Sequence, residues 1–122
     1  MAKGLEGRVA IITGGSRGIG RAVVQCLAED GASVVVSGLD PARLEAATKE
    51  LEGFGAPVLG VVADVARRED VERLVDQTKD HFARIDVLVN NAGITRDALL
   101  VRMKDEDWDR VLDVNLRGAF LM

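Results

Sequence analysis

Four short runs of apolar, mostly β-branched residues recur along the chain, and segments with helical periodicity lie between them. The runs are Val9–Ile12, Val34–Val36, Val58–Val62 and Val87–Val89. They lack the alternation of polar and apolar residues that marks a half-exposed strand, which is typical of parallel strands covered on both faces. The pattern therefore predicts a parallel β-sheet.

The intervening segments predict three helices, because their apolar residues recur every three or four positions. Ile19, Val23 and Leu27 would share a face of the first helix, Leu44, Ala47 and Leu51 a face of the second, and Val71, Leu74, Val75, Thr78 and Phe82 a face of the third.

Two of these helices carry signals at their starts. Asp40-Pro41 offers a side-chain acceptor followed by a proline, which favours a helix beginning there. The third helix is expected to begin near Ala66, whose side chain cannot accept from exposed N–H groups, a loss of about 1 kcal/mol. Glu69 and Asp70 in its first turn offset part of that loss.

Alternating strands and helices predict one α/β domain over residues 1–122, with a Rossmann-type sheet of strand order 3-2-1-4 and helices on both faces. At the C-terminal end, Asp105 is expected to cap a helix that continues to Met122. Its apolar pattern is still running there, so we expect the domain to be incomplete at the C-terminus. One face of this helix would hold Trp108, Val111, Leu112, Asn115 and Ala119.

The most informative segment is the glycine-rich turn at residues 13–20, Thr-Gly-Gly-Ser-Arg-Gly-Ile-Gly, between the first strand and the first helix. Gly14 can adopt φ values closed to other residues, Gly18 lets the backbone approach a ligand, and Gly20 lets the helix pack closely on the strand. The N-terminus of a helix suits an anion. We therefore predict a site for the pyrophosphate of a dinucleotide; the alternative is a tight structural turn that binds nothing.

Composition narrows the class of protein. The 122 residues carry a net charge of −4, which disfavours general nucleic-acid binding. We find no signal peptide and no apolar stretch long enough to span a membrane, so we expect a cytoplasmic location. The single cysteine, Cys26, falls on the predicted apolar side of the first helix and is interpreted as a small core residue. The sequence shows no cluster of metal-ligating residues, so we predict no metal site.

Three features together resemble the short-chain dehydrogenase/reductase family: the glycine-rich turn, the Asn-Asn-Ala-Gly segment at residues 90–93, and Asn115. Within that family the chain is most similar to 3-oxoacyl-acyl-carrier-protein reductases of fatty acid biosynthesis, on the strength of residues 93–97 and of the stretch from Met103 to Gly118. The resemblance implies an NAD(P)-dependent oxidoreductase that reduces a 3-oxoacyl thioester or a similar ketone.

The resemblance also implies cofactor-binding roles. Asp64 and Val65 would meet the adenine edge, although Asp64 as a loop residue bonded to nearby backbone is an alternative. For Asn91 two interpretations remain open, a structural role and a contact with the cofactor. The implied cofactor-binding residues are Gly14, Ser16, Arg17, Gly18, Ile19, Gly20, Asp64, Val65, Asn90, Ala92 and Gly93.

Cofactor choice follows from charge. Users of NAD place a carboxylate just after the second strand, where this chain has Gly38, so nothing there repels a 2′-phosphate. Arg17 would attract that phosphate, and a surface-only role for Arg17 is the alternative. Leu39 replaces an arginine found in many NADP-dependent relatives, and Asp40 follows it. These observations favour NADP(H) over NAD(H).

The family's catalytic serine, tyrosine and lysine are missing, and the sequence contains no tyrosine at all. Of the catalytic set the resemblance leaves only Asn115, which would hold a water beside the catalytic lysine; a satisfied core amide is the alternative. His81 lies away from the glycine-rich turn and is interpreted as a terminal helix residue. We therefore expect the chain alone not to turn over.

Two hypotheses remain open from the sequence. One is the NADP-binding part of a ketoreductase, and the other is a non-catalytic module that binds a dinucleotide or assembles with itself. An uncovered fourth strand and an apolar C-terminal helix predict a homo-oligomer through that edge, that helix, or both.

Overall fold

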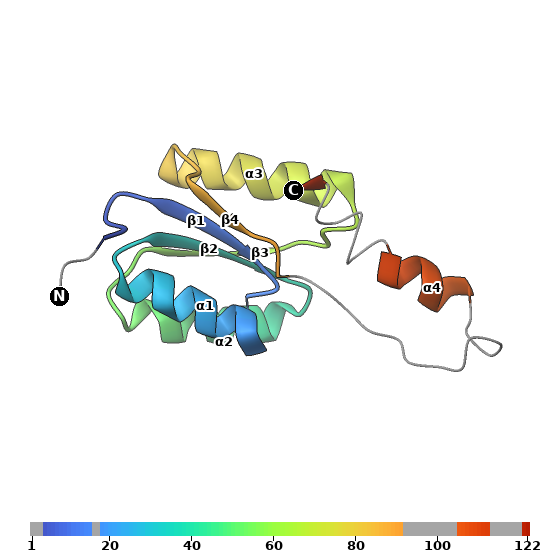
Figure 1. The fold of residues 1–122 in the computed structure, drawn as a ribbon, viewed down its shortest axis with the longest axis horizontal. Coiled ribbons are helices and arrows are strands. Elements are labelled where there is room, and N and C mark those ends of the chain that lie inside the picture. The colour runs from blue at the N-terminus through green and yellow to red at the C-terminus, as the bar shows by residue number, and fades with distance from the viewer. Residues whose placement is uncertain (1–3, 16–17, 92–104, 113–120) are drawn as a thin grey trace.

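A computed structural model describes residues 4–15, 18–91, 105–112 and 121–122 of the chain (Figure 1). Strands and helices alternate along it as the hydrophobic pattern predicts. The elements are β1 (Val9–Thr13), α1 (Gly18–Glu29), β2 (Ser33–Gly38), α2 (Pro41–Glu52), β3 (Val58–Val62), α3 (Arg68–Phe82), β4 (Val87–Val89) and α4 (Asp105–Leu112).

The four strands form one parallel sheet in the order β3-β2-β1-β4, which confirms the predicted order. The central strands β1 and β2 are buried along nearly their whole length, whereas the outer strands β3 and β4 keep exposed positions. Burial on both faces therefore holds for the centre of the sheet and weakens at its edges.

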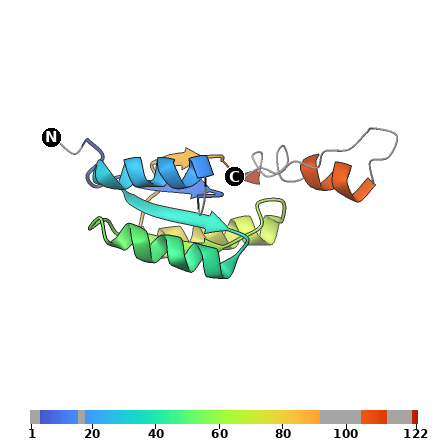
Figure 2. The same ribbon diagram turned by 90° about the horizontal axis from the view of Figure 1, so that it is seen from below.

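Helices cover both faces of the sheet. Figures 1 and 2 show α1 and α2 on one face and α3 on the other, with α4 beyond the carboxyl ends of the strands. Alternate residues of the strands contribute to two hydrophobic cores, one on each face of the sheet. The core under α1 and α2 contains Ile12, Val34 and Val36, and the core under α3 contains Ile11 and Val35.

The predicted apolar face of α1 is confirmed for Val23 and Leu27, which are partly buried against the core, and is wrong for Ile19. The fully buried residues of α1 are Gly20, Val24 and Ala28, while Ile19 is 80% exposed. Small residues at both ends of that stripe let the helix approach the sheet closely. Cys26 is consequently exposed and is not a core residue, which corrects the interpretation of its pattern.

The starts of α2 and α3 differ in their capping. Asp40 caps α2 and Pro41 is its first residue, as predicted. The α3 helix begins at Arg68, two residues later than expected, and its N-cap residue Arg67 makes no side-chain capping bond. The N–H of Ala66 donates instead to Asp64 Oδ1 in the preceding loop.

The C-terminal part is described only in pieces. The α4 helix has Asp105 as its first residue rather than as the residue that caps it, and its described part ends at Leu112. Residues 113–120 of the predicted continuation lie outside the described residues. Met122 returns to the sheet and packs against the core under α3. Among the helices that the structure describes, none is long and apolar enough to cross a bilayer.

Candidate functional site at the carboxyl edge of the sheet

The turn after β1 has the backbone conformation that its glycines predict. Gly14 has φ of 67° and Gly18 has φ of 61°, both in the left-handed region that favours glycine. Among the described residues, a Cβ built on Gly18 would meet no atom within 4 Å, so they leave open space in front of its backbone. The described glycines of this turn lie between the carboxyl end of β1 and the start of α1. We call residues 14–20 the glycine corner.

Close packing explains the other glycines of the glycine corner. A Cβ on Gly20 would lie 2.2 Å from Asn91 Nδ2 and 2.6 Å from the carbonyl oxygen of Gly14. A Cβ on Gly15 would lie 2.9 Å from Val24, which packs beneath the turn. The predicted packing role of Gly20 is therefore confirmed, and Gly15 is a further constrained position that sequence reasoning missed.

Asn91 ties the glycine corner to the end of β4. Its Nδ2 donates to the carbonyl oxygen of Gly14 at 3.1 Å, and its backbone N donates to the hydroxyl of Thr13 at 3.1 Å. That hydroxyl donates in turn to the carbonyl oxygen of Val89 at 3.4 Å. Asn91 thus has the structural role that was one of its two alternatives. The contribution of buried Thr13 was missed, since a threonine at the end of a strand carries no special signal.

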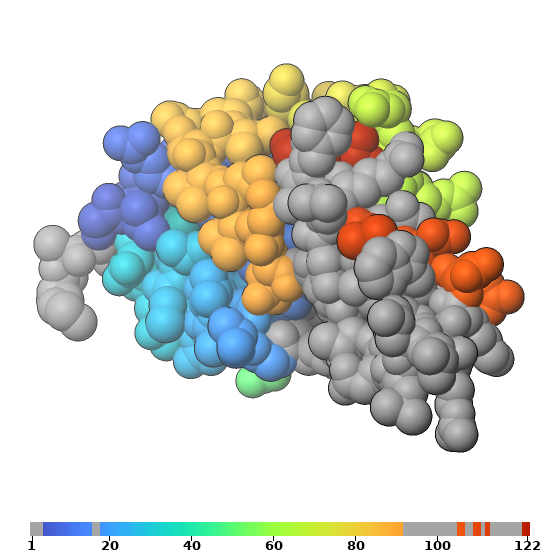
Figure 3. Space-filling view, turned by 45° about the vertical axis from the view of Figure 1, so that its right-hand side comes forward, coloured from blue at the N-terminus to red at the C-terminus, as the bar shows by residue number. Residues whose placement is uncertain are grey.

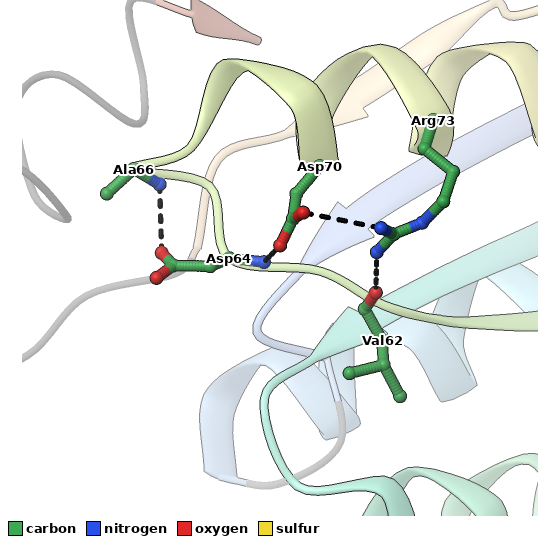
Figure 4. A network of polar contacts seen from close by, with 5 residues as sticks. All are labelled: Val62, Asp64, Ala66, Asp70 and Arg73. Carbon is green, nitrogen blue, oxygen red and sulfur yellow. Dashed lines mark hydrogen bonds and ion pairs between the residues drawn. The ribbon is translucent and has the colours of Figure 1, made fainter.

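The loop between β3 and α3 forms the neighbouring part of the same edge (Figure 4). The backbone N of Asp64 donates to Asp70 Oδ2 at 2.8 Å, and Asp64 Oδ1 accepts from the N of Ala66 at 3.0 Å. Arg73 pairs with Asp70 Oδ1 at 3.3 Å and also donates to the carbonyl oxygen of Val62. These contacts fix the loop from both sides.

The remaining oxygen of Asp64 faces α4. Asp64 Oδ2 lies 2.8 Å from Arg110 Nη1, and the Asp64 side chain is 18% exposed. The side chain of Val65 is buried beneath the loop. The alternative interpretation of Asp64, a loop residue bonded to nearby backbone, is thus observed, although each carboxylate oxygen keeps a further lone pair for a ligand.

Apolar side chains stand exposed at this edge. Ile19 begins α1 and is 80% exposed, Leu39 follows β2 and is 55% exposed, and Val62 ends β3 and is 40% exposed. Val62 pairs with Gly38 in the sheet, so Leu39 and Val62 leave the sheet at the same level. The edge therefore presents apolar surface of the kind that an aromatic base can cover.

Charge at the edge favours an anion near α1. The first turn of α1 contains no acidic residue, whereas Glu69 and Asp70 lie in the first turn of α3. The one carboxylate directly after β2, that of Asp40, caps α2 by accepting from the N–H groups of Ala42 and Arg43. The positive end of the α1 dipole is thus not neutralised by acids of its own first turn.

Several predicted site residues have no description in the structure. Ser16, Arg17, Ala92, Gly93 and Asn115 lie outside the described residues. Asn90 is exposed directly after β4.

His81 lies near the far end of α3, where it borders a shallow hollow of about 300 Å³ with Leu59, Gln77 and Asp80. Over the described residues, no group of three or more His, Cys, Asp or Glu could hold a metal ion.

The sheet order and the glycine corner together define a Rossmann-type α/β domain. A model of the short chain dehydrogenase family matches residues 8–122. The chain therefore belongs to the short-chain dehydrogenase family, of which it represents the N-terminal, NAD(P)-binding portion.

Curated relatives include a 3-oxoacyl-acyl-carrier-protein reductase of Thermotoga maritima, 48% identical over 95% of this chain and 47% of the relative. One of Synechocystis is 49% identical over 96% of this chain and 48% of the relative. A solved short chain dehydrogenase from Burkholderia cenocepacia, in complex with NADP, has a TM-score of 0.91 and 38% identity over 96% of this chain and 48% of that one. The chain thus spans about half the length of the relatives it matches.

Proposed function

We propose that this chain binds NADP(H) along the carboxyl edge of its sheet, as part of an oxidoreductase that reduces a 3-oxoacyl thioester or a similar ketone. The observation that carries the proposal is the glycine corner, where two left-handed glycines open the backbone at the start of a helix with no acid in its first turn. When bound, the coenzyme supplies a hydride to the carbonyl carbon.

The residues present fit the pyrophosphate. Gly18 has open space where a Cβ would project, so a phosphate can approach the backbone there. The corner is held in shape by Asn91, which bonds Gly14, and by the tight fit of Gly20. Because Gly14 and Gly20 are already held in place, binding need not order these two residues first.

Adenosine fits the adjacent part of the edge. Ile19, Leu39 and Val62 offer exposed apolar surface, and Asp64 offers a carboxylate to the exocyclic amine. The backbone N–H of Val65 is proposed to donate to the ring. Asn90, with Ala92 and Gly93, is proposed to lie beneath the ribose on the nicotinamide side.

Preference for NADP(H) rests on the residues after β2. Gly38 ends the strand without a carboxylate, and Asp40 is engaged in capping α2. Arg17 is proposed to bind the 2′-phosphate. The NADP complex of the Burkholderia cenocepacia relative supports the same choice.

The catalytic contribution proposed for this chain is limited to Asn115. The sequence of this chain has no tyrosine, the residue that the family uses to move the proton. We therefore propose that the chain alone binds the coenzyme without turning it over. An assay of NADPH oxidation with a 3-oxoacyl thioester tests this directly. Turnover by the purified chain would contradict it.

The test of cofactor binding is calorimetry with NADP⁺ and NAD⁺. We expect NADP⁺ to bind the wild type more tightly, and Arg17→Ala to weaken NADP⁺ about tenfold while leaving NAD⁺ nearly unchanged. Lys79→Ala, on the exposed last turn of α3, removes the same charge away from the edge and is the control. No heat with either coenzyme would refute the proposal. Equal NADP⁺ affinity in wild type and in Arg17→Ala would remove Arg17 from it.

Self-assembly is the second candidate function, and the observation that favours it is the outer strand β4. In the described sheet β4 pairs only with β1, and Leu88 on it is 38% exposed. Figure 3 shows the orange segment that contains β4 at the surface beside α1. We propose that two copies associate through this edge or through the C-terminal helix. Sedimentation that shows a monomer at high micromolar concentration would contradict it, and Leu88→Lys should weaken association through the strand.

A further inference from the structure

The ion pair between Asp64 and Arg110 joins the loop after β3, which is proposed to meet adenine, to α4, which has no part in the proposed site so far. Arg110 lies on α4, 46 residues after Asp64, and its Nη1 is 2.8 Å from Asp64 Oδ2. Among the described residues of α4, it makes the one ion pair to the rest of the fold. Arg110 thus reaches the loop proposed to meet adenine without itself being part of that loop.

The contact fixes the direction of the Asp64 carboxylate. Oδ1 accepts from the N of Ala66 at 3.0 Å, and Oδ2 is held by Arg110 at 2.8 Å. With both oxygens engaged, rotation of the carboxylate is restricted, yet each oxygen keeps a lone pair. A carboxylate fixed in this way loses less conformational entropy when it accepts one further hydrogen bond.

Charge around the loop gives Arg110 a second effect. Asp70 lies close to Asp64 and uses its Oδ1 to pair with Arg73. Each of the two carboxylates therefore has its own arginine partner, and Arg110 is the described partner of Asp64. Removal of Arg110 leaves Asp64 beside another carboxylate, with its carboxylate held on one side only, by the N–H of Ala66.

From these contacts we propose that Arg110 is a positioning residue for the adenosine half of the ligand, acting through Asp64 and coupling the docking of α4 to coenzyme binding. This inference rests on the proposed binding of NADP(H). Because coupling is reciprocal, a ligand that binds better when Asp64 is held also stabilises α4 against the sheet.

Titrations of the full chain with 2′,5′-ADP and with nicotinamide mononucleotide test the inference. We expect Arg110→Ala to weaken 2′,5′-ADP about tenfold and to leave nicotinamide mononucleotide unchanged, since only the former contains adenosine. Arg110→Lys keeps the cation and should recover most of the affinity. Arg68→Ala removes the same charge from an exposed position at the start of α3 and is the matched control.

A double-mutant cycle separates positioning from general stability. If Arg110 acts through Asp64, Arg110→Ala should cost little further affinity in an Asp64→Asn background. Hydrogen exchange adds the reciprocal readout: 2′,5′-ADP should slow exchange in α4 of the wild type and not of Arg110→Ala.

The outcomes distinguish the two proposals. Wild type that binds neither NADP⁺ nor 2′,5′-ADP would refute the proposed function and the positioning role with it. Wild type that binds 2′,5′-ADP, while Arg110→Ala binds it equally or more tightly, would overturn only the positioning role. An equal loss in Arg68→Ala would assign the effect to net charge and would also overturn it.

Discussion

The two ends of the same parallel sheet are built in opposite ways. At the amino end, Asp86 Oδ2 accepts from the backbone N of Val9 at 2.8 Å, and Asp86 Oδ1 pairs with Arg84 at 2.6 Å and with Arg8 at 3.8 Å. At the carboxyl end, Gly14 and Gly18 open the backbone instead. The amino end satisfies its polar groups with the chain's own residues, whereas the carboxyl end keeps open backbone and exposed apolar surface available to a ligand.

This difference predicts that substitutions affecting stability and substitutions affecting ligand affinity lie at different ends of the sheet. Substitutions at the amino end should change stability and leave ligand affinity intact. Substitutions at the glycine corner should fall into two kinds, because some of its glycines are packed and others face open space.

The largest effect is expected where the corner is packed. In Gly20→Ala the new methyl would lie 2.2 Å from Asn91 Nδ2 and 2.6 Å from the carbonyl oxygen of Gly14. We expect a loss of about 3 kcal/mol in the free energy of unfolding, measured by urea denaturation. Gly4→Ala, whose Cβ would meet nothing within 4 Å, is the control. A Gly20→Ala protein as stable as that control would contradict the packing.

The second effect concerns the amino end. The hydrogen bond from Arg84 and the one from the N of Val9 hold the pKa of Asp86 below its usual value. A carboxyl with a lowered pKa in the folded state stabilises the protein above its unfolded pKa near 4, and this stabilisation is lost as the pH falls through the lower, folded pKa.

Asp86→Asn should therefore be less stable than wild type at pH 7, and the difference should shrink on acidification below about pH 4. Thermal unfolding of both proteins from pH 7 to pH 2 measures this. NADP⁺ affinity of Asp86→Asn should match that of wild type, and a loss of affinity would break the separation between the two ends.

A smaller effect on stability is expected at Gly18. Alanine there must adopt φ near the observed 61°, at a cost of about 1 kcal/mol, and meets no neighbouring atom. NADP⁺ affinity should nevertheless fall about tenfold, because the methyl projects into the proposed phosphate position. Denaturation and calorimetry on Gly18→Ala measure both. A loss of stability without any loss of affinity would show that the open space is not a ligand site.

The smallest effect is expected on the surface of α1. Cys26 is exposed, so Cys26→Ser should change the free energy of unfolding by less than about 0.5 kcal/mol. The thiol of the folded wild type should react with a soluble disulfide reagent at the rate of an exposed cysteine. A thiol that reacts only on unfolding would restore the core interpretation of Cys26.

The strands could be predicted from the sequence because apolar runs are local patterns. Their order followed from the Rossmann-type class that the glycine-rich turn and the alternation of strands and helices indicate. The start of α2 was equally predictable from Asp40-Pro41, which carries its own capping signal. The most buried positions of α1 were not, because Gly20 and Ala28 contribute little to an apolar pattern although they line the contact.

The contacts that shape the site were out of reach for a different reason. Asn91 and Gly14 are 77 residues apart, and Arg110 and Asp64 are 46 apart. No periodicity links residues at such separations, and only the folded chain brings them together. The conformation of Gly14 and the packing of Gly20 were predictable, whereas the constraint on Gly15 and the side chains that hold the corner in shape were not.

The most direct test is a two-dimensional NMR titration of the wild-type chain with NADP⁺, which reads both ends of the sheet at once. The amide signals of Gly14, Gly15, Gly18 and Gly20 should shift saturably, while those of Asp86 and Val87 stay in place. Glycine amides that do not move at millimolar NADP⁺, or shifts of equal size at both ends, would contradict a coenzyme site at the carboxyl edge.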